Sequence, residues 1–188
     1  MSQLISDTPL GGVKLIQPRV FRDDRGWFME NWRHEHYQAL GMDNHFVQTN
    51  SSHSTQGVIR GLHYQWPTPQ GKLVWVSQGA VFDVAIDIRP DSEQFGQWFG
   101  VELSDENHQQ LWIPPGFAHG FQVTSPRATF HYQCTAPYRP DADRAVAFDD
   151  PTIGIDWPLA PMGISDKDAK APRLNDIAPQ HLPTCESC

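Results

Sequence analysis

The hydrophobic positions of the chain recur every second residue, in short runs that glycine and proline separate. The clearest run covers residues 80–88, where apolar side chains alternate with a face that carries Asp83 and Asp87. A period of two places successive side chains on opposite faces of a strand. A second apolar run lies at residues 73–77, and Gln and Gly at 78–79 separate the two runs. This arrangement predicts a β-hairpin with one apolar face.

Further runs of the same kind extend along most of the chain, with 14 glycines and 16 prolines among them. Helical periodicity is scarce, and residues 33–40 predict one short helix that Gly41 would close. Frequent turns between short alternating strands indicate an all-β fold, a sandwich or a jelly roll, with short helices at its periphery. The additional strands are expected at residues 13–21, 27–32, 46–51, 57–65, 95–103, 109–113, 120–124 and 129–135.

The length of 188 residues suits one well-buried core. We therefore expect a single domain over residues 1–188, without internal repeats. After Asp149 the sequence is rich in proline and predicts loops and short helical turns. A flexible tail is expected from about residue 175.

The charge balance narrows the classes of partner. The chain has 14 Lys and Arg residues against 22 Asp and Glu residues, a net charge of -8. Nucleic-acid binding needs a clustered positive field, so we exclude it, whereas an anionic small ligand needs only a few converging cations. The first ten residues lack the pattern of a signal peptide, and no segment approaches a membrane span of roughly 20 apolar residues. These features predict a soluble, cytoplasmic protein without a membrane partner.

Two short motifs resemble parts of metal sites but lack a complete ligand set. The three cysteines, Cys134, Cys185 and Cys188, cannot form an even disulfide framework, and the terminal C-E-S-C has no second pair to complete a zinc site. We expect free thiols there. His34 and His36 lie two residues apart in the expected helix and do not share a face, so they predict a solvated surface.

Residues 57–65, G-V-I-R-G-L-H-Y-Q, combine a guanidinium, a glycine and an imidazole in one expected strand, with Lys72 close behind. Histidine titrates near neutral pH, so His63 in a rigid strand beside cations is suited to proton transfer. Taken alone, a histidine in a strand is more often a hydrogen-bonded structural residue. Strict alternation would place Arg60 and His63 on opposite faces, so a site that contains both predicts a bulge or bend at Gly61.

A second motif narrows the architecture. The pattern P-x-G-x-x-H at residues 114–119 resembles the second motif of the cupin jelly rolls, and the run around His63 resembles the first. Metal-binding cupins carry H-x-H and a later Glu in that first motif. Here Gln65 stands at the second His position and residues 66–72 contain no carboxylate, so too few ligands remain for a catalytic metal. We expect a cupin-like jelly roll without a metal.

Several ordered segments make a more specific resemblance. They are F-x-D-x-R-G-x-F-x-E at 21–30, Q-T-N at 48–50, R-G-L-H-Y-Q at 60–65, G-K-L-V at 71–74, F-D-V-A-I-D-I-R at 82–89, I-P-P-G-F-A-H-G-F at 113–121, Y-x-C-T at 132–135, D-D-P at 149–151 and S-x-K-D at 165–168. In these segments the chain resembles the dTDP-4-dehydrorhamnose 3,5-epimerases. That family inverts two carbons of a nucleotide-linked 4-keto-6-deoxy sugar on the way to dTDP-L-rhamnose.

The resemblance implies proton transfer at the two carbons that flank a carbonyl group. A base can remove either proton if the enolate oxygen is stabilised, and an acid on the opposite face completes inversion. By resemblance, His63 is the base, Asp168 orients its imidazole, Tyr132 is the acid and Lys72 lies near the carbonyl oxygen. The resemblance implies no metal and no redox cofactor.

Tyr132 also has a simpler interpretation from its own strand. Phe130, Tyr132 and Cys134 share one face of the run at 129–135, while His131 faces the other way. A tyrosine on an apolar face is usually a core residue with a hydrogen-bonded hydroxyl.

The resemblance further implies a nucleotide-sugar site and a homodimer in which segment 21–30 reaches the active site of the partner. Pro137 and Asp143 depart from the Tyr and Glu that relatives carry there, which bears on the nucleoside preference. The substrate-binding residues implied are Arg25, Glu30, Gln48, Asn50, Arg60, Lys72, His119, Tyr138, Asp143 and Lys167.

Three alternatives stay open on the sequence alone. An epimerase that inverts only C3 or C5 would share nearly all of these segments. A metal-dependent cupin enzyme would need the ligands that are missing here. A sugar-binding cupin without activity would not need a base, an acid and a cation together.

Overall fold

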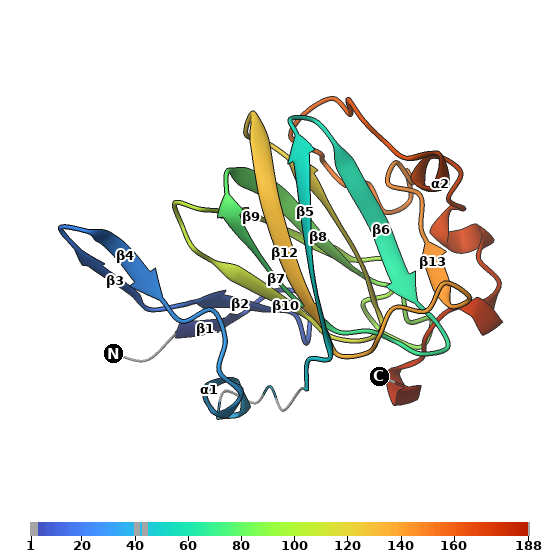
Figure 1. Cartoon of the computed structure of the whole chain (residues 1–188). Helices are drawn as coiled ribbons and strands as arrows, with labels where there is room; N and C mark the ends of the chain where they lie inside the picture. Colours follow the sequence, from blue (N-terminus) through green and yellow to red (C-terminus); the bar gives the residue numbers. More distant parts are fainter. Residues whose placement is uncertain (1–3, 40–41, 43–44, 188) are drawn as a thin grey trace.

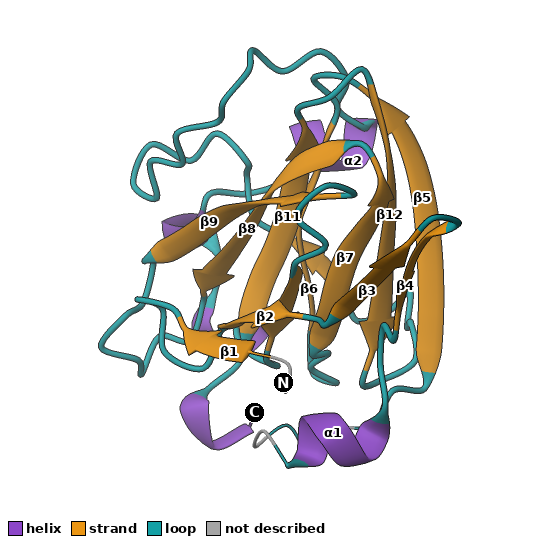
Figure 2. Ribbon diagram, turned by 90° about the vertical axis from the view of Figure 1, so that its left-hand side faces the viewer, coloured by secondary structure: helices purple, strands orange, loops and turns teal. Residues whose placement is uncertain are grey.

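Two antiparallel β-sheets face each other in the computed structural model of the chain, which describes residues 4–39, 42 and 45–187 (Figure 1). The first sheet has six strands in the order β1 (Leu4–Asp7), β2 (Lys14–Gln17), β10 (Gln110–Ile113), β7 (Lys72–Gln78), β12 (Arg127–Cys134) and β5 (Gln48–Thr55). The second has five, in the order β13 (Asp143–Ala145), β6 (Ile59–Gln65), β11 (Phe117–Val123), β8 (Ala80–Asp87) and β9 (Trp98–Ser104). Figure 2 shows β8 and β9 on one side of the sandwich and β12 and β5 on the other.

Helical segments are short and lie outside the sandwich. They are α1 (His34–Gln38), α2 (Asp166–Ala169) and the single 3₁₀ turns η1 (Leu174–Asp176), η2 (Pro179–His181) and η3 (Cys185–Ser187). No helix in the described part of the chain is long and apolar enough to cross a bilayer.

The observed strands follow the predicted alternation. The runs at 57–65 and 80–88 are β6 and β8, and the prediction of an all-β sandwich is confirmed. The run at 13–21 is divided, because Pro18 has no N–H to pair and lies between β2 and the next strand, β3 (Val20–Asp23). Strands β1 and β13 were not predicted.

The hydrophobic core lies between the sheets and is built from alternate residues of the central strands. Its buried members include Val74, Val76, Val81, Ala85, Leu111, Ile113, Phe121, Val123 and Phe130. On β8 the same inward face carries Asp83 and Asp87, both fully buried. The face of β8 that bears the two carboxylates is therefore the inner one.

The apolar face of β8 points outward and is covered by the C-terminal segment of the chain, which runs along the second sheet (Figure 1). The buried side chains of this outer layer include Leu62, Val84, Ile86, Val146, Ile153, Leu174 and Leu182. Leu174 is 2% exposed and Leu182 is 3% exposed. Burial of one leucine side chain is worth about 1.5–3 kcal/mol, so these two side chains hold the segment against the sheet.

The structure therefore differs from the expected flexible tail after residue 175. The indole Nε1 of Trp66 donates to the carbonyl of Gln180 at 2.9 Å, and the hydroxyl of Tyr64 donates to the carbonyl of His181 at 3.1 Å. Irregularly spaced apolar residues among prolines carry no period, which is why the sequence did not predict this docking.

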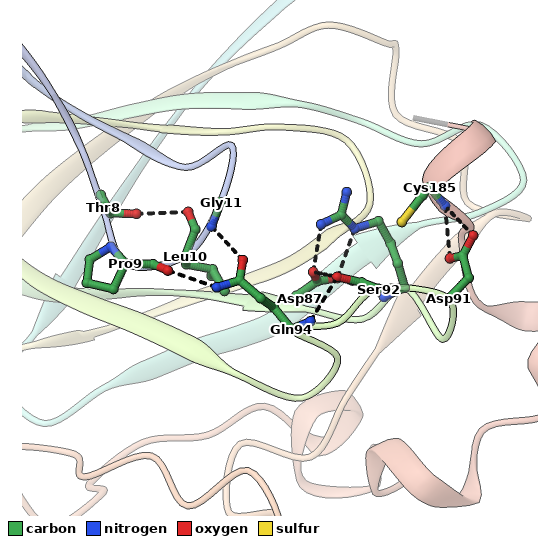
Figure 3. Close-up of polar contacts among 10 residues, drawn as sticks. Thr8, Pro9, Leu10, Gly11, Asp87, Asp91, Ser92, Gln94 and Cys185 are labelled. Atoms are coloured by element: carbon green, nitrogen blue, oxygen red, sulfur yellow. Dashed lines mark hydrogen bonds and ion pairs between the residues drawn. The ribbon is translucent and has the colours of Figure 1, made fainter.

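The described chain stays attached up to its last turn. The backbone N–H of Cys185 donates to the carboxylate of Asp91 at 3.0 Å (Figure 3). The thiol of Cys185 is free, whereas Cys188, the other half of the C-E-S-C motif, lies outside the described residues.

The predicted helix at 33–40 is present as α1, and Leu40 and Gly41, at its expected end, lie outside the described residues. Tyr37 is buried, and its hydroxyl lies 2.6 Å from Oε1 of Gln110 on the outer face of the first sheet. This contact anchors α1 and covers part of that face.

A hairpin of β3 and β4 (Gly26–Met29) projects away from the sandwich (Figure 1). It exposes the large side chains of Phe21, Trp27 and Phe28, with Phe28 68% exposed. Next to its turn, the ring of Trp27 packs 4.6 Å from the ring of His108. The hairpin thus offers an aromatic surface outside the core.

Candidate active site

A cavity of about 460 Å³ opens between the two sheets and is walled by both of them. The first sheet contributes side chains from β5, β7 and β12, and the second contributes side chains from β6, β11 and β13. The segment at 163–168 forms a further wall. The predicted site residues that line this cavity are Gln48, Asn50, Arg60, His63, Lys72, His119, Tyr132, Tyr138, Asp143, Lys167 and Asp168.

A β-bulge at Gly61 brings Arg60 and His63 to the same cavity. On β11, His119 pairs with His63 and Phe121 pairs with Arg60, so Gly61 and the next residue of β6 together oppose a single residue of β11. Gly61 has φ +131°, and a Cβ there would lie 2.5 Å from the Cα of Gly120. Only glycine fits this position, and the predicted bulge is confirmed.

The imidazole of His63 is held by a buried carboxylate. Its Nε2 lies 2.6 Å from Oδ1 of Asp168, which is 4% exposed. Burial alone would raise the pKa of Asp168. The hydrogen bond and the charge of His63 oppose this, as do the N–H of Gly61 and a hydrogen bond with Ser165. Together they hold the pKa of Asp168 below its usual value. An ionised carboxylate only accepts hydrogen bonds, so the imidazole proton lies on Nε2. Nδ1 is left as the basic nitrogen.

Ser165 explains how the carboxylate is positioned. It is the N-cap of α2, and its hydroxyl accepts the backbone N–H of Asp168 at 3.1 Å. The capped turn fixes the backbone that carries Asp168 at the cavity wall.

Lys72 enters the cavity from β7 on the first sheet. The side chain is buried, and its Nζ donates to the carbonyl of His63 at 3.3 Å. Burial lowers the pKa of Lys72, against the opposing influence of Cys134, Asp83 and Asp143. A buried ammonium with a lowered pKa releases its proton more readily than an exposed lysine.

A second histidine–carboxylate pair lies near Lys72. Nε2 of His119 is 2.9 Å from Oδ2 of Asp83, and both side chains are buried. Burial lowers the pKa of His119, and the nearby Asp83 only partly offsets this. Sequence reasoning missed Asp83 as a site residue, although the alternation of β8 already separated it from the apolar face.

Tyr132 projects from β12 into the cavity, on the opposite sheet from His63. Burial raises the pKa of its hydroxyl, which therefore keeps its proton at neutral pH. In the residues that the structure describes, this hydroxyl has no hydrogen-bond partner. The predicted alternation is confirmed, since His131 lies on the other face, between the hydroxyls of Ser51 and Ser77 at 2.7 Å each.

One end of the cavity is lined by polar side chains that bind one another. The hydroxyl of Tyr138 donates to Oδ2 of Asp143 at 3.0 Å, and Lys167 forms an ion pair with the same oxygen. The hydrogen bond to Asp143 raises the pKa of Tyr138. Farther along the cavity wall, Nε of Arg60 donates to Ser54 at 3.0 Å.

Arg25 and Glu30 are the two predicted site residues that the structure does not bring to this cavity. Arg25 lies at the turn of the hairpin with its side chain 90% exposed, where its Nε donates to Asp23 at 3.1 Å. Glu30 forms an ion pair with Arg33, and its Oε1 lies 3.2 Å from Nδ1 of His36.

Among the described residues, no three His, Cys, Asp or Glu side chains converge as a metal site. His34 and His36, which the sequence placed on a solvated surface, lie on α1 outside the cavity. The amide of Gln65, at the position of a cupin metal ligand, is hydrogen-bonded to neighbouring backbone.

Comparison with known proteins identifies the family of the chain. A family model described as dTDP-4-dehydrorhamnose 3,5-epimerase matches residues 7–176. The chain is 49% identical over 164 residues to the dTDP-4-dehydrorhamnose 3,5-epimerase of Methanothermobacter thermautotrophicus. The matched region covers 86% of this chain and 89% of that protein.

Solved structures are similar over nearly the whole chain. A dTDP-6-deoxy-D-glucose-3,5-epimerase from Legionella pneumophila, in complex with dTDP-4-keto-L-rhamnose, has a TM-score of 0.95 at 48% identity and covers 97% of this chain and 98% of that chain. A 3′-monoepimerase from Streptomyces bikiniensis, in complex with dTDP-quinovose, has a TM-score of 0.88 at 32% identity and covers 100% and 94%. The cupin-like jelly roll is confirmed, and the chain belongs to the dTDP-4-dehydrorhamnose 3,5-epimerase family of isomerases.

Proposed function

We propose that this protein inverts C3 and C5 of dTDP-4-dehydro-6-deoxy-D-glucose to give dTDP-4-dehydro-L-rhamnose, a step toward dTDP-L-rhamnose. The observation that carries the proposal is the placement of a base and an acid on opposite walls of one cavity. His63 comes from the second sheet and Tyr132 from the first. A planar enolate held between the two sheets would meet one group on each face.

His63 acts as the base. Its Nδ1 removes the proton from a carbon beside the 4-keto group, and the imidazolium that forms is stabilised by the ionised Asp168 at 2.6 Å. The carboxylate also keeps the ring in one orientation, as the third member of a catalytic triad does.

Lys72 stabilises the charge that develops on the carbonyl oxygen. A cation in a buried site interacts more strongly with an oxyanion than one in water. Its lowered pKa also suits hydrogen-bond donation or proton transfer to the enolate oxygen. His119, fixed by Asp83, projects from β11 on the opposite sheet and contributes a binding contact to the sugar.

Tyr132 returns a proton to the face opposite His63, which inverts the carbon. Its hydroxyl is protonated at neutral pH, and burial raises its pKa further above that range. Reprotonation from the side of His63 would restore the starting configuration, so the acid decides whether the cycle ends in inversion.

The nucleotide diphosphate binds at the polar end of the cavity. Lys167 there and Arg60 farther along β6 supply cations. Gln48, Asn50, Tyr138 and Asp143 supply hydrogen bonds and an aromatic face. The aspartate at Asp143, one methylene shorter than the glutamate of relatives, is already engaged by Tyr138 and Lys167.

We further propose a homodimer in which the hairpin of β3 and β4 completes the site of the partner. Arg25 and Glu30 lie outside the cavity of their own chain, while Phe21 and Phe28 are exposed beside Arg25. A cation with aromatic neighbours suits a phosphate and a nucleobase.

The enzyme acts as a single epimerase domain in the cytoplasm, and it uses no metal and no redox cofactor.

The test is NMR of the 4-keto sugar nucleotide incubated with the enzyme in deuterated water. Deuterium is expected at both C3 and C5 of the product, because both protons are acidified by the same carbonyl. Incorporation at one carbon alone would indicate a single epimerase, the activity named for the 32% identical relative from Streptomyces bikiniensis. Incorporation at neither carbon would refute the enzyme proposal.

A further inference from the structure

Gln65 holds the loop that carries Tyr138. Its Oε1 accepts the backbone N–H of Arg139 at 2.8 Å, and its Nε2 donates to the carbonyl of Pro137 at 3.2 Å. One amide therefore binds the residue before Tyr138 and the residue after it. The same Nε2 donates to the carbonyl of Thr68 at 2.8 Å, so the loop is tied to the turn that follows β6.

The side chain of Gln65 is suited to this role by burial and by strand position. It is 5% exposed, and both ends of its amide are satisfied by backbone partners. Carbonyl oxygens surround Nε2 and an N–H faces Oε1, so only one orientation of the amide satisfies the contacts. Gln65 lies two residues after His63 on β6, so one strand positions both the base and the Tyr138 loop.

Two further glutamines bind the same loop, one from the segment before β7 and one from β5. Nε2 of Gln70 donates to the carbonyl of Ala136 at 2.6 Å, and Oε1 of Gln48 accepts the backbone N–H of Tyr138 at 2.8 Å. The four residues at 136–139 are thus each held by a glutamine side chain. A loop fixed at every residue presents its aromatic ring in one place.

The position of this loop affects the charged end of the cavity. The hydroxyl of Tyr138 donates to Asp143, and the same carboxylate oxygen pairs with Lys167. Displacement of the loop would move the ring and release a hydrogen bond from Asp143. Gln65 itself also lines the cavity. A change at Gln65 therefore reaches the ligand-binding end of the cavity through Tyr138, as well as from its own place in the wall.

We propose that Gln65 is a positioning residue for nucleotide binding: at the place where metal-binding cupins carry a ligand, its amide fixes the loop 136–139 and so orients Tyr138 and Asp143. The inference rests on the proposed function. It assigns Gln65 to the binding of the nucleotide and leaves the proton-transfer groups His63 and Tyr132 outside its influence.

The variant Gln65→Glu tests this proposal because it preserves the shape of the side chain, replaces the donor amide with an oxygen and adds a negative charge. The carboxylate can still accept the N–H of Arg139, but it cannot donate to the carbonyl oxygens of Pro137 and Thr68 and is repelled by them. We expect the dissociation constant for dTDP, measured by calorimetry, to rise about tenfold and KM to rise similarly. At saturating substrate, kcat is expected to stay within about twofold of wild type, since transition-state groups are unchanged.

Gln94→Glu is the matched control. Gln94 binds another loop in the same way, with Nε2 donating to the carbonyl of Pro9 at 2.8 Å and Oε1 accepting the N–H of Gly11 at 2.7 Å (Figure 3). None of these residues lines the cavity. This variant should lower the melting temperature without changing the dissociation constant for dTDP.

A second variant, Gln65→Met, removes the hydrogen bonds without adding a charge, and both Gln65 variants are first checked for a cooperative thermal transition. Weaker dTDP binding by both, with kcat retained, supports the proposal. The proposal is overturned if the folded variants bind dTDP as wild type does, or if kcat falls while the affinity for dTDP holds. It is also overturned if neither variant folds, because Gln65 would then be purely structural. Failure of wild type itself to bind dTDP would instead refute the proposed function.

Discussion

Nε2 of His63 on β6 lies 2.6 Å from Oδ1 of Asp168, although 105 positions separate the two residues in the sequence. The contact depends on the bulge at Gly61, which turns His63 toward the cavity, and on the capped turn at Ser165, which presents the carboxylate. The pair therefore joins a strand and a C-terminal turn into one proton-transfer unit.

Asp168→Asn should leave nucleotide binding intact and lower kcat by about 10²–10⁴. The amide can donate to the imidazole, which favours the tautomer with its proton on the nitrogen that faces the cavity. Steady-state kinetics with a parallel measurement of the dissociation constant for dTDP would check this. An unchanged kcat would mean that His63 does not need its carboxylate partner.

His63→Ala and Tyr132→Phe should separate proton removal from inversion. Without His63 no enolate forms, so solvent exchange and product formation should both be abolished. Tyr132→Phe deletes only the hydroxyl, so the enolate should still form and be reprotonated from the side of His63. The expected result is deuterium exchange at C3 or C5 that exceeds product formation, measured by NMR. Parallel loss of both in folded, nucleotide-binding Tyr132→Phe would contradict its role as the acid.

Mixing Arg25→Ala with His63→Ala should restore activity that neither variant has alone. If Arg25 acts in the site of the partner, a mixed dimer contains one site with an intact His63 and an intact Arg25. Random reassortment would give about a quarter of wild-type activity, since half of the dimers are mixed and each has one complete site. Activity would be measured after unfolding and refolding the variants together, with each refolded alone as a control. No recovery from properly folded mixtures would place Arg25 in its own site or outside any site.

Asp150→Asn should lower the free energy of unfolding by about 1–3 kcal/mol at neutral pH, because the carboxylate accepts the N–H of Leu174 at 2.7 Å and that of Thr152 at 2.9 Å. Burial opposes its ionisation, but these hydrogen bonds hold the pKa of Asp150 below its usual value of 3.8. Its stabilisation is therefore complete above the unfolded-state pKa and is lost as pH falls through the lower folded-state pKa.

Urea unfolding at neutral and acidic pH would measure this effect. The difference between wild type and Asp150→Asn should shrink below about pH 4. The neighbouring exposed Asp149 supplies the control, since Asp149→Asn should change stability by less than about 0.5 kcal/mol. A difference that is constant with pH would show that the charge of Asp150 is not responsible.

Leu174→Ala should destabilise the protein by about 2–5 kcal/mol, because a side chain that is 2% exposed would leave a cavity between the C-terminal segment and the second sheet. Leu4→Ala, at a leucine that is 67% exposed, should change the free energy of unfolding by less than about 0.5 kcal/mol. Chemical denaturation of both variants provides the comparison. Equal effects would mean that the segment after residue 146 does not stabilise the sheet.

The sequence by itself determined most of the strands, the family and the bulge, although it did not predict β1 and β13. Period-two alternation is a local property of a strand, so β6, β8 and β12 could be predicted, and so could the opposite faces of Tyr132 and His131. The bulge at Gly61 followed from the requirement that Arg60 and His63 share a site.

Only the tertiary structure decided which face of each strand is the inside. Alternation separates Asp83 from its apolar neighbours, but the burial of Asp83 beside His119 depends on a second sheet and on a C-terminal segment that covers the opposite face. Leu174 and Leu182 gave no periodic signal because they contact the sheet from short turns among prolines. Gln65 appeared in the sequence only as a missing metal ligand, and its hydrogen bonds to the Tyr138 loop join strand β6 to backbone 72 and 74 positions away. Such contacts form when distant segments pack, so they cannot be read from the pattern of any one of them.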